Sequence, residues 1–337
     1  MKAILMQEPG VVQLIEQPMP EMADDALLLR VEYVGLCGSD LSAYSGHSPM
    51  MVFPNVPGHE IAARIEAVGD AVPDGFAVGD LVLVKPYFPC GKCPACRNNR
   101  PNACEFNQTM GTQRPGALCE YITVPYAHAL VCNDIEPQTA ALVEPLSVGM
   151  HLINRVEARE GDVVAVFGCG VIGLGAIAAA VYKKARVFAV DVSAEKLAQA
   201  RRMGAEQLVN ATDADAVAAL KALTQGDGVD IALECSGANG TFNQAIESVK
   251  FTGKMGVVSY TKQDVTFNTK LLVAKELNIY GSRNAVTEFE TVLDMVRSGI
   301  VPVDELITFV CAPDDVEGAF KKWKADPASI TKILTKW

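Results

Sequence analysis

The pattern of apolar and polar positions changes near residue 150. Up to that point the chain reads as short apolar segments separated by proline and glycine, such as Leu27–Val34 and Leu81–Val84. Short apolar runs bounded by turn residues are typical of β-strands. We therefore expect a β-rich, loop-rich domain over residues 1–150.

Beyond residue 162 apolar runs alternate with helical stretches. Six runs are strand candidates: Val163–Phe167, Arg186–Val190, Gln207–Val209, Val229–Leu233, Met255–Val258 and Leu277–Tyr280. Predicted helices are Ser193–Met203, with Ser193 as N-cap and Gly204 as its stop, and Ala214–Leu223. A further helix is expected over Val286–Ser298, followed by a final β segment. Strands that alternate with helices predict a doubly wound parallel α/β sheet.

Composition narrows the class of protein. A chain of 337 residues is long for one core, so two domains are expected. The net charge of −11 argues against nucleic acid or an anionic membrane as a partner, because both need a basic surface. The N-terminus lacks the apolar core of a signal peptide, and we expect a soluble, cytoplasmic protein.

A glycine-rich turn follows the first strand of the second half. Val163–Phe167 runs directly into Gly168-Cys-Gly170-Val-Ile-Gly173, and an alanine-rich helix follows. This context is the one that a dinucleotide-binding turn requires. Asp191 ends the next strand, where a carboxylate binds ribose hydroxyls and favours NAD over NADP. The expected cofactor-binding residues are Gly168, Gly170, Val171, Ile172, Gly173 and Asp191.

Two groups of residues are candidate metal ligands. Four cysteines lie within one short segment: Cys90, Cys93, Cys96 and Cys104. In a reducing compartment such a cluster indicates a closed, structural zinc site rather than disulfides. A thiolate, an imidazole and two carboxylates, which also suit zinc, are Cys37, His59, Glu60 and Glu144. They lie far apart in the sequence, so spacing alone leaves open whether they converge.

The chain resembles the zinc-dependent medium-chain dehydrogenases of the alcohol and polyol type. The resemblance rests on five motifs: GLCGSD at 35–40, GHE at 58–60, the four-cysteine lobe, VEPL at 143–146 and GCGVIG at 168–173. It implies a GroES-like catalytic domain over residues 1–150, with a zinc lobe at about 88–106. A Rossmann NAD-binding domain over 151–284 and a return segment over 285–337 would follow.

The same resemblance implies roles for particular residues. Cys37 and His59 would be ligands of a catalytic zinc, and Glu60 and Glu144 would bind it directly or through water. Many relatives have a proton-relay histidine where this chain has Ser42. The relay is therefore open between Ser39 with Ser42, His47 and Glu144. Two zinc ions and NAD are the implied cofactors, and a homodimer or homotetramer is the implied assembly.

With glutamate at position 144, the chain resembles the sorbitol dehydrogenase branch of this family. Within that branch, the stretches 44–60 and GSRN at 281–284 resemble bacterial sugar-acid dehydrogenases that act on L-galactonate or L-gulonate. We expect hydride transfer between a secondary alcohol of a hexonate and NAD. Arg283 would either bind a substrate hydroxyl or carboxylate, or make a structural contact.

The sequence is also compatible with other functions. The substrate could instead be sorbitol or another polyol, butanediol or L-threonine. A catalytically silent redox sensor would be expected to lack some of the site ligands, yet all four are present. A nucleic-acid-binding zinc ribbon at 90–104 is disfavoured by the acidic charge.

Overall fold

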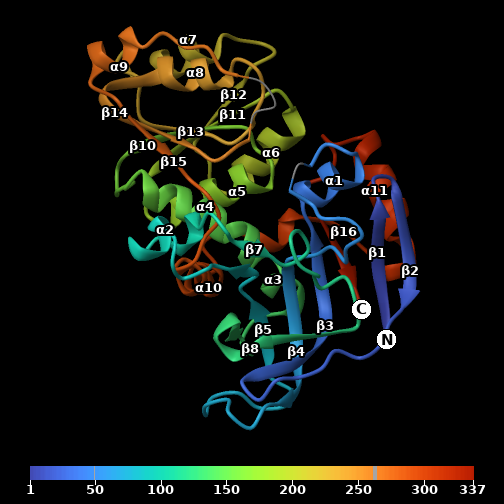
Figure 1. The fold of residues 1–337 in the computed structure, drawn as a ribbon. Coiled ribbons are helices and arrows are strands. Elements are labelled where there is room, and N and C mark those ends of the chain that lie inside the picture. Colours follow the sequence, from blue (N-terminus) through green and yellow to red (C-terminus); the bar gives the residue numbers. More distant parts are fainter. Residues whose placement is uncertain (49, 261–263) are drawn as a thin grey trace. The chain divides into compact units, whose positions relative to one another are not determined.

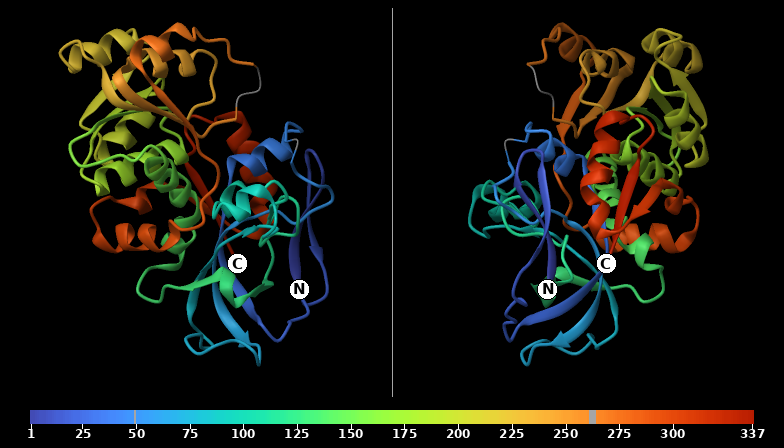
Figure 2. Two further views of the ribbon diagram at one scale, coloured as in Figure 1. Left: turned by 60° about the vertical axis from the view of Figure 1, so that its left-hand side comes forward. Right: turned by 90° about the vertical axis from the view of Figure 1, so that its right-hand side faces the viewer.

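The computed structural model describes residues 1–48, 50–260 and 264–337, which divide into two compact units. The first unit contains residues 1–144 and 306–337, and the second contains residues 145–305. Figure 1 and Figure 2 trace the chain through both units. No helix in the described ranges is long and apolar enough to cross a membrane.

A mixed β-sheet forms the centre of the first unit. Over the described residues it has seven strands: β16 (Ile307–Cys311), β17 (Lys332–Lys336), β3 (Ala26–Leu36), β4 (Glu60–Val68), β5 (Leu81–Val84) and β9 (Ala129–Val131) in that order, with β8 (Tyr121–Pro125) also on β3. Two small sheets accompany it, β1 (Lys2–Glu8) with β2 (Val11–Glu16), and β6 (Tyr87–Phe88) with β7 (Gln108–Thr109). The helical segments are α1 (Gly38–Tyr44), α2 (Pro94–Arg97), α3 (Pro137–Ala140), α11 (Val316–Ala325) and the 3-10 turns η1 (Pro101–Ala103), η2 (Tyr126–His128) and η4 (Pro313–Asp315).

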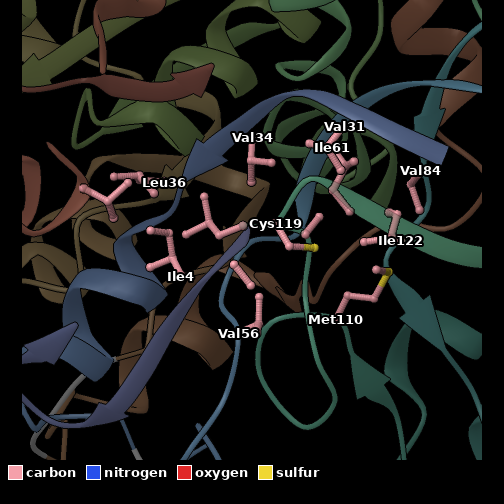
Figure 3. Close-up of a cluster of buried hydrophobic side chains, with 14 of the residues drawn as sticks. Ile4, Val31, Val34, Leu36, Val56, Ile61, Val84, Met110, Cys119 and Ile122 are labelled. Carbon is pink, nitrogen blue, oxygen red and sulfur yellow. The ribbon is translucent and has the colours of Figure 1, made fainter. Parts of the chain in front are cut away.

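Apolar side chains on the strands of the first unit form one core. Ile4, Val31, Val34, Ile61 and Cys119 are at most 2% exposed, and Figure 3 shows them in one cluster. Each such aliphatic side chain contributes roughly 1.5–3 kcal/mol when it is fully buried. The antiparallel pair of β3 and β4 is therefore a rigid support for the residues at its ends.

The second unit is built on a parallel sheet. Within the described residues its six strands have the order β12 (Gln207–Asn210), β11 (Arg186–Asp191), β10 (Val163–Phe167), β13 (Val229–Glu234), β14 (Val249–Val257) and β15 (Asn278–Gly281). The helices are α4 (Val143–Arg155), which begins at the end of the first unit, α5 (Val171–Tyr182), α6 (Ala194–Arg202), α7 (Ala216–Leu223), α8 (Thr241–Ser248), α9 (Lys270–Lys275) and α10 (Phe289–Ser298), with η3 at Val303–Leu306. This is the 3-2-1-4-5-6 strand order of a Rossmann sheet.

The predicted α/β class and parallel sheet are confirmed, with differences in detail. All six predicted strands are present, but β14 begins at Val249 rather than Met255, because Val249 already pairs with Val229 before a register shift. The helix expected from Val286 begins at Phe289, since Val286 N–H donates to the Glu288 side chain instead. α10 packs on α5, and the chain returns to the first unit later than residue 285.

Candidate metal and dinucleotide sites

Four cysteine side chains gather in the loop between β6 and β7. The sulfur atoms of Cys90, Cys93, Cys96 and Cys104 all lie within 4.8 Å of one another. The Cys93 sulfur is 3.5 Å from that of Cys96 and 3.8 Å from that of Cys104. Tetrahedral zinc with Zn–S bonds of about 2.3 Å has sulfur–sulfur edges of about 3.8 Å. The cluster therefore has the spacing that zinc requires.

Short helical turns and backbone N–H groups hold these sulfur atoms in place. α2 begins directly after Cys93, and η1 ends directly before Cys104. The N–H of Cys93 donates to the Cys90 sulfur at 3.4 Å, and the N–H of Cys90 donates to the Cys104 sulfur at 3.2 Å. Backbone N–H groups, that of Cys96 first, lower the pKa of the Cys93 thiol to about 6. Such donors favour the thiolate, which is the metal-binding form.

A second cluster forms where β3 ends and β4 begins. Cys37 follows β3 directly, and His59 directly precedes β4, whose first residue is Glu60. The antiparallel register pairs Gly35 with Glu60, so Cys37 and His59 come to the same end of the strand pair. The metal-binding atoms of Cys37, His59 and Glu60 all lie within 4.8 Å of one another. The fold therefore converts two distant motifs into one potential metal site.

Glu60 is held by a buried lysine that the sequence analysis missed. Lys332, the first residue of β17, places its Nζ 2.6 Å from both Oε1 and Oε2 of Glu60. The same Nζ donates to the carbonyl oxygen of Leu36 at 3.1 Å. Both charged side chains are fully buried. A Cβ atom at Gly35 would lie 1.8 Å from Oε2 of Glu60, so only glycine leaves room for this carboxylate.

Glu144 lies in the first turn of α4, at the end of the first unit. It is 5% exposed and accepts a hydrogen bond from the hydroxyl of Tyr87, which is itself buried. Among the described residues, the compact ligand set contains Cys37, His59 and Glu60 but does not extend to Glu144. Glu144 is nevertheless close enough to His59 to influence its pKa. Tyr87 therefore restrains a carboxylate at the margin of the metal cluster.

The electrostatics of this cluster favour a cation. Burial alone would lower the pKa of His59, but Cys37, Asp40 and Glu144 raise it well above its ordinary value. Burial raises the pKa of Glu144, and the nearby His59 opposes that rise. Burial and the adjacent Glu144 raise the pKa of Tyr87 well above its ordinary value, so Tyr87 acts as a donor. An environment that favours positive charge on an imidazole also favours a divalent metal ion at the same place.

The donor set fits zinc. A thiolate, an imidazole and a carboxylate are the ligand types that zinc takes in catalytic sites. The Nδ1 atom of His59 is buried and has no hydrogen-bond partner within the described part of the chain, and neither does Oδ1 of Asp40. The other Asp40 oxygen accepts the Cys37 N–H at 2.9 Å, which fixes the start of α1. A buried imidazole nitrogen without a partner, beside a thiolate and a carboxylate, fits a metal ion.

In the second unit, the glycine-rich turn connects β10 to α5. Gly168 has a φ of +92°, and a Cβ atom there would lie 2.7 Å from the Cβ of Ser236. A Cβ at Gly173 would lie 1.9 Å from the carbonyl oxygen of Gly168, whereas one at Gly170 would face open space. The turn therefore has no room for a side chain at Gly168 or Gly173 and has open space at Gly170, as close approach by a pyrophosphate requires.

Asp191 lies at the end of β11, next to this turn. One carboxylate oxygen accepts the N–H of Cys169 at 2.6 Å, and the other accepts the N–H of Ser193 at 2.9 Å. These bonds fix the carboxylate beside the glycine-rich turn. Its remaining lone pairs suit ribose hydroxyls, and its negative charge disfavours a 2′-phosphate.

The remaining predicted residues have less defined places. Ser39 and Ser42 are half-buried on α1, close in sequence to Cys37, whereas His47 is exposed. Arg283 follows β15 in the second unit and is half-buried. The stretch 44–60, which carries part of the resemblance, includes residue 49, which lies outside the described residues.

A Rossmann sheet in one unit and two sets of zinc-type ligands in the other define a zinc-dependent dehydrogenase. Residues 171–298 match the zinc-binding dehydrogenase family, and residues 23–134 match the alcohol dehydrogenase GroES-like domain. The chain belongs to the zinc-type medium-chain alcohol and polyol dehydrogenases.

Relatives and solved structures match almost the whole chain. Sorbitol dehydrogenase of Bacillus subtilis is 32% identical, covering 96% of this chain and 93% of that protein. L-galactonate-5-dehydrogenase of Escherichia coli is 31% identical, covering 91% of each. An alcohol dehydrogenase of Escherichia coli CFT073, solved with NADH, has a TM-score of 0.93 and 26% identity over 100% of this chain and 99% of that chain.

Proposed function

We propose that this protein oxidises a secondary hydroxyl group of a hexonate, such as L-galactonate or L-gulonate, with NAD as the acceptor. The observation that carries the proposal is the convergence of Cys37, which is half-buried, with the buried His59 and Glu60 in one cluster of the first unit, with the buried Glu144 nearby. A silent relative would have no reason to keep this ligand set. The catalytic unit in this proposal consists of residues 1–144 and 306–337.

In this proposal Cys37 and His59 hold the catalytic zinc, and Glu60 and Glu144 bind it directly or through water. Zinc bound there would lower the pKa of a hydroxyl group in contact with it toward neutrality. Lys332 takes up part of the charge of Glu60, because it contacts both carboxylate oxygens. The hydroxyl of Tyr87 donates to Glu144 and restrains the position of that carboxylate.

The chain must also move the proton of the substrate hydroxyl. Ser39 and Ser42 lie half-buried on α1, close in sequence to Cys37, and their hydroxyls can pass a proton toward water. His47 is exposed, and Glu144 is buried beside Tyr87. We propose the serines as the relay, because they combine closeness to Cys37 with partial access to solvent. A bound substrate hydroxyl would donate to this chain of hydroxyls.

The second unit binds the coenzyme in this proposal. The turn formed by Gly168, Gly170 and Gly173, with Val171 and Ile172 in the first turn of α5, receives the pyrophosphate. NAD supplies the hydride-accepting ring. Asp191, fixed by two backbone N–H groups, selects NAD over NADP. The four-cysteine lobe holds a second, structural zinc.

The choice of a hexonate over a neutral polyol rests on the relative that acts on L-galactonate. A polyol such as sorbitol is the second candidate, favoured by the Bacillus subtilis relative. Arg283 is the residue that we propose for the substrate carboxylate, since a guanidinium binds carboxylates through two parallel hydrogen bonds. Its replacement by leucine should weaken hexonate turnover more than sorbitol turnover.

Two further expectations remain predictions. β15 is at the edge of the parallel sheet and its residues are largely exposed, so we propose it as a pairing surface in a dimer. A cytoplasmic location also remains a prediction.

The test is a coenzyme-reduction assay followed by absorbance. The panel contains L-galactonate, L-gulonate, L-idonate, sorbitol, L-threonine and 2,3-butanediol, each with NAD and with NADP, before and after chelation. Chelator-sensitive turnover of a hexonate with NAD would support the proposal. Turnover of sorbitol alone would mean that a polyol rather than a hexonate is the substrate, and it would leave the proposed mechanism unchanged. Silence across the panel, in protein with both zinc sites filled, would refute the proposed substrates.

A further inference from the structure

A buried carboxylate lies at the carboxyl end of β13, outside every predicted motif. Glu234 is the last residue of that strand and is 1% exposed. It pairs with Phe167 of β10 on one side and with Val257 of β14 on the other. β10, β13 and β14 lie side by side in the sheet (Figure 1). Ligands of such sheets bind beyond the carboxyl ends of the strands, where the strand order reverses, which here is between β10 and β13.

Glu234 organises the loop that follows it. Its Oε1 accepts the backbone N–H groups of Ser236 at 3.0 Å and Gly237 at 2.9 Å. The hydroxyls of Ser236 and Thr241 lie 2.8 and 2.9 Å from the same oxygen. Its Oε2 accepts the hydroxyl of Ser259, which follows β14. One carboxylate thus connects the loop 235–241 with the end of the next strand.

This loop packs directly against the glycine-rich turn. A Cβ atom on Gly168 would lie 2.7 Å from the Cβ and 2.9 Å from the Cα and N atoms of Ser236. The N–H of Cys235 donates to the carbonyl oxygen of Phe167, the residue just before Gly168, at 2.9 Å. The position of Ser236 therefore defines the space that the turn occupies, and Glu234 defines the position of Ser236.

We infer that Glu234 is a positioning residue for the dinucleotide-binding turn, acting through Ser236 on Gly168. The inference deepens the proposed function and rests on its assignment of NAD to the second unit. Without the carboxylate, the part-buried N–H groups of Ser236 and Gly237 lose their acceptor and the loop relaxes away from the turn. The turn must then become ordered as the coenzyme binds, and the free-energy cost of this ordering weakens binding.

The bonding pattern predicts which substitution preserves the function. Glutamine keeps an acceptor oxygen for the two N–H groups and places its NH₂ group toward Ser259, whose hydroxyl can accept. Alanine removes every one of these bonds. Ser259→Ala removes the bond at Oε2 and leaves the two N–H bonds at Oε1 in place. Glu206→Ala is the matched control, because Glu206 is an exposed carboxylate of the same unit that pairs with Arg186.

The experiment titrates NADH into each purified variant and follows the fluorescence of the coenzyme, with calorimetry as a second readout. Glu234→Ala should raise the Kd for NADH about tenfold or more, while Glu234→Gln stays within about threefold of wild type. Ser259→Ala should raise it about threefold, and Glu206→Ala should leave it unchanged. Melting without ligand and zinc content are measured in parallel, so that a general loss of structure is separated from a loss of coenzyme binding.

Wild-type Kd in Glu234→Ala would overturn the inference, as would equal weakening in the glutamine and alanine variants. If Glu234→Ala does not fold, the variants Ser259→Ala and Glu234→Gln test the inference instead. A wild-type Kd for NADH in Ser259→Ala, or a tenfold weaker affinity for NADH in Glu234→Gln, would then overturn the inference. Wild-type protein that binds no NADH would overturn the proposed function, and this inference with it. Wild-type binding with unaffected Glu234 variants would overturn the inference alone.

Discussion

Replacing Lys332 with methionine tests how the candidate metal cluster is stabilised. The lysine Nζ contacts both oxygens of Glu60 at 2.6 Å, and both side chains are 0% exposed. Methionine fills the volume of the lysine stem but leaves the Glu60 carboxylate buried without its cation. Removal of one partner from a buried ion pair costs about 3–5 kcal/mol. We expect the first unit to lose stability by that amount.

The assay uses urea denaturation followed by tryptophan fluorescence. The chain has two tryptophans, Trp323 and Trp337, and both belong to the first unit. Their emission therefore reports the unfolding of that unit, even if the second unit unfolds in a separate transition. Zinc content is measured for each variant, so that loss of metal is separated from loss of the ion pair.

The matched control is Lys336→Met, which makes the same substitution on the same strand at an exposed position. It should change the unfolding free energy by less than about 0.5 kcal/mol. The double variant Lys332→Met/Glu60→Met removes both charges and should recover at least about half of the loss. A Lys332→Met protein as stable as the control would refute a stabilising role for this ion pair, as would losses of the two single variants that simply add.

Three further predictions concern other sites. Glu144→Ala should lower kcat about 10–100-fold with an unchanged Kd for NADH; equal turnover would remove Glu144 from the site. Cys93→Ser should lose one zinc per chain by metal analysis, whereas Cys132→Ser, a buried cysteine outside the lobe, should keep both; full zinc in the first variant would contradict the lobe assignment. Burial alone would raise the pKa of Glu288, but the bond from His151 lowers it to about 2. The ionised side chain of Glu288 therefore contributes about 2 kcal/mol to the stability of the folded protein. This contribution is present above the unfolded pKa of about 4.3 and is lost as the pH falls toward 2. Acid unfolding of Glu288→Gln, followed by circular dichroism, should lack this loss, and parallel curves for the two proteins would argue against it.

The fold was predictable from the sequence because its signals are local. The run Val163–Phe167 is apolar throughout, as a strand buried on both faces requires, and it matches β10 at both ends. The cap Ser193 and the stop Gly204 bound α6 as expected. β14 was mispredicted at its start, because Val249 joins the sheet through a pairing with Val229 that no local pattern reveals.

The residues of the site were predictable only where they lie close together in the sequence. The four cysteines lie within one loop, so their spacing alone indicates a metal. Tyr87 stands beside that lobe in the sequence, yet an isolated tyrosine gives no signal that it binds Glu144. Lys332 is 272 positions from Glu60. A lysine on a strand is usually exposed, so only the pairing of β17 with β3 reveals its role.

The C-terminal strand ties the candidate metal pocket to the folding of the whole first unit. The chain leaves this unit after Glu144 and returns at Leu306, so residues 145–305 separate two parts of a single core. Until β17 pairs with β3, the carboxylate of Glu60 has no buried cation beside it. A buried, unpaired carboxylate is too costly to persist, so Glu60 must stay hydrated until Lys332 arrives. The pairing of β17 with β3 therefore both closes this sheet and gives Glu60, in the candidate metal cluster, its buried cation.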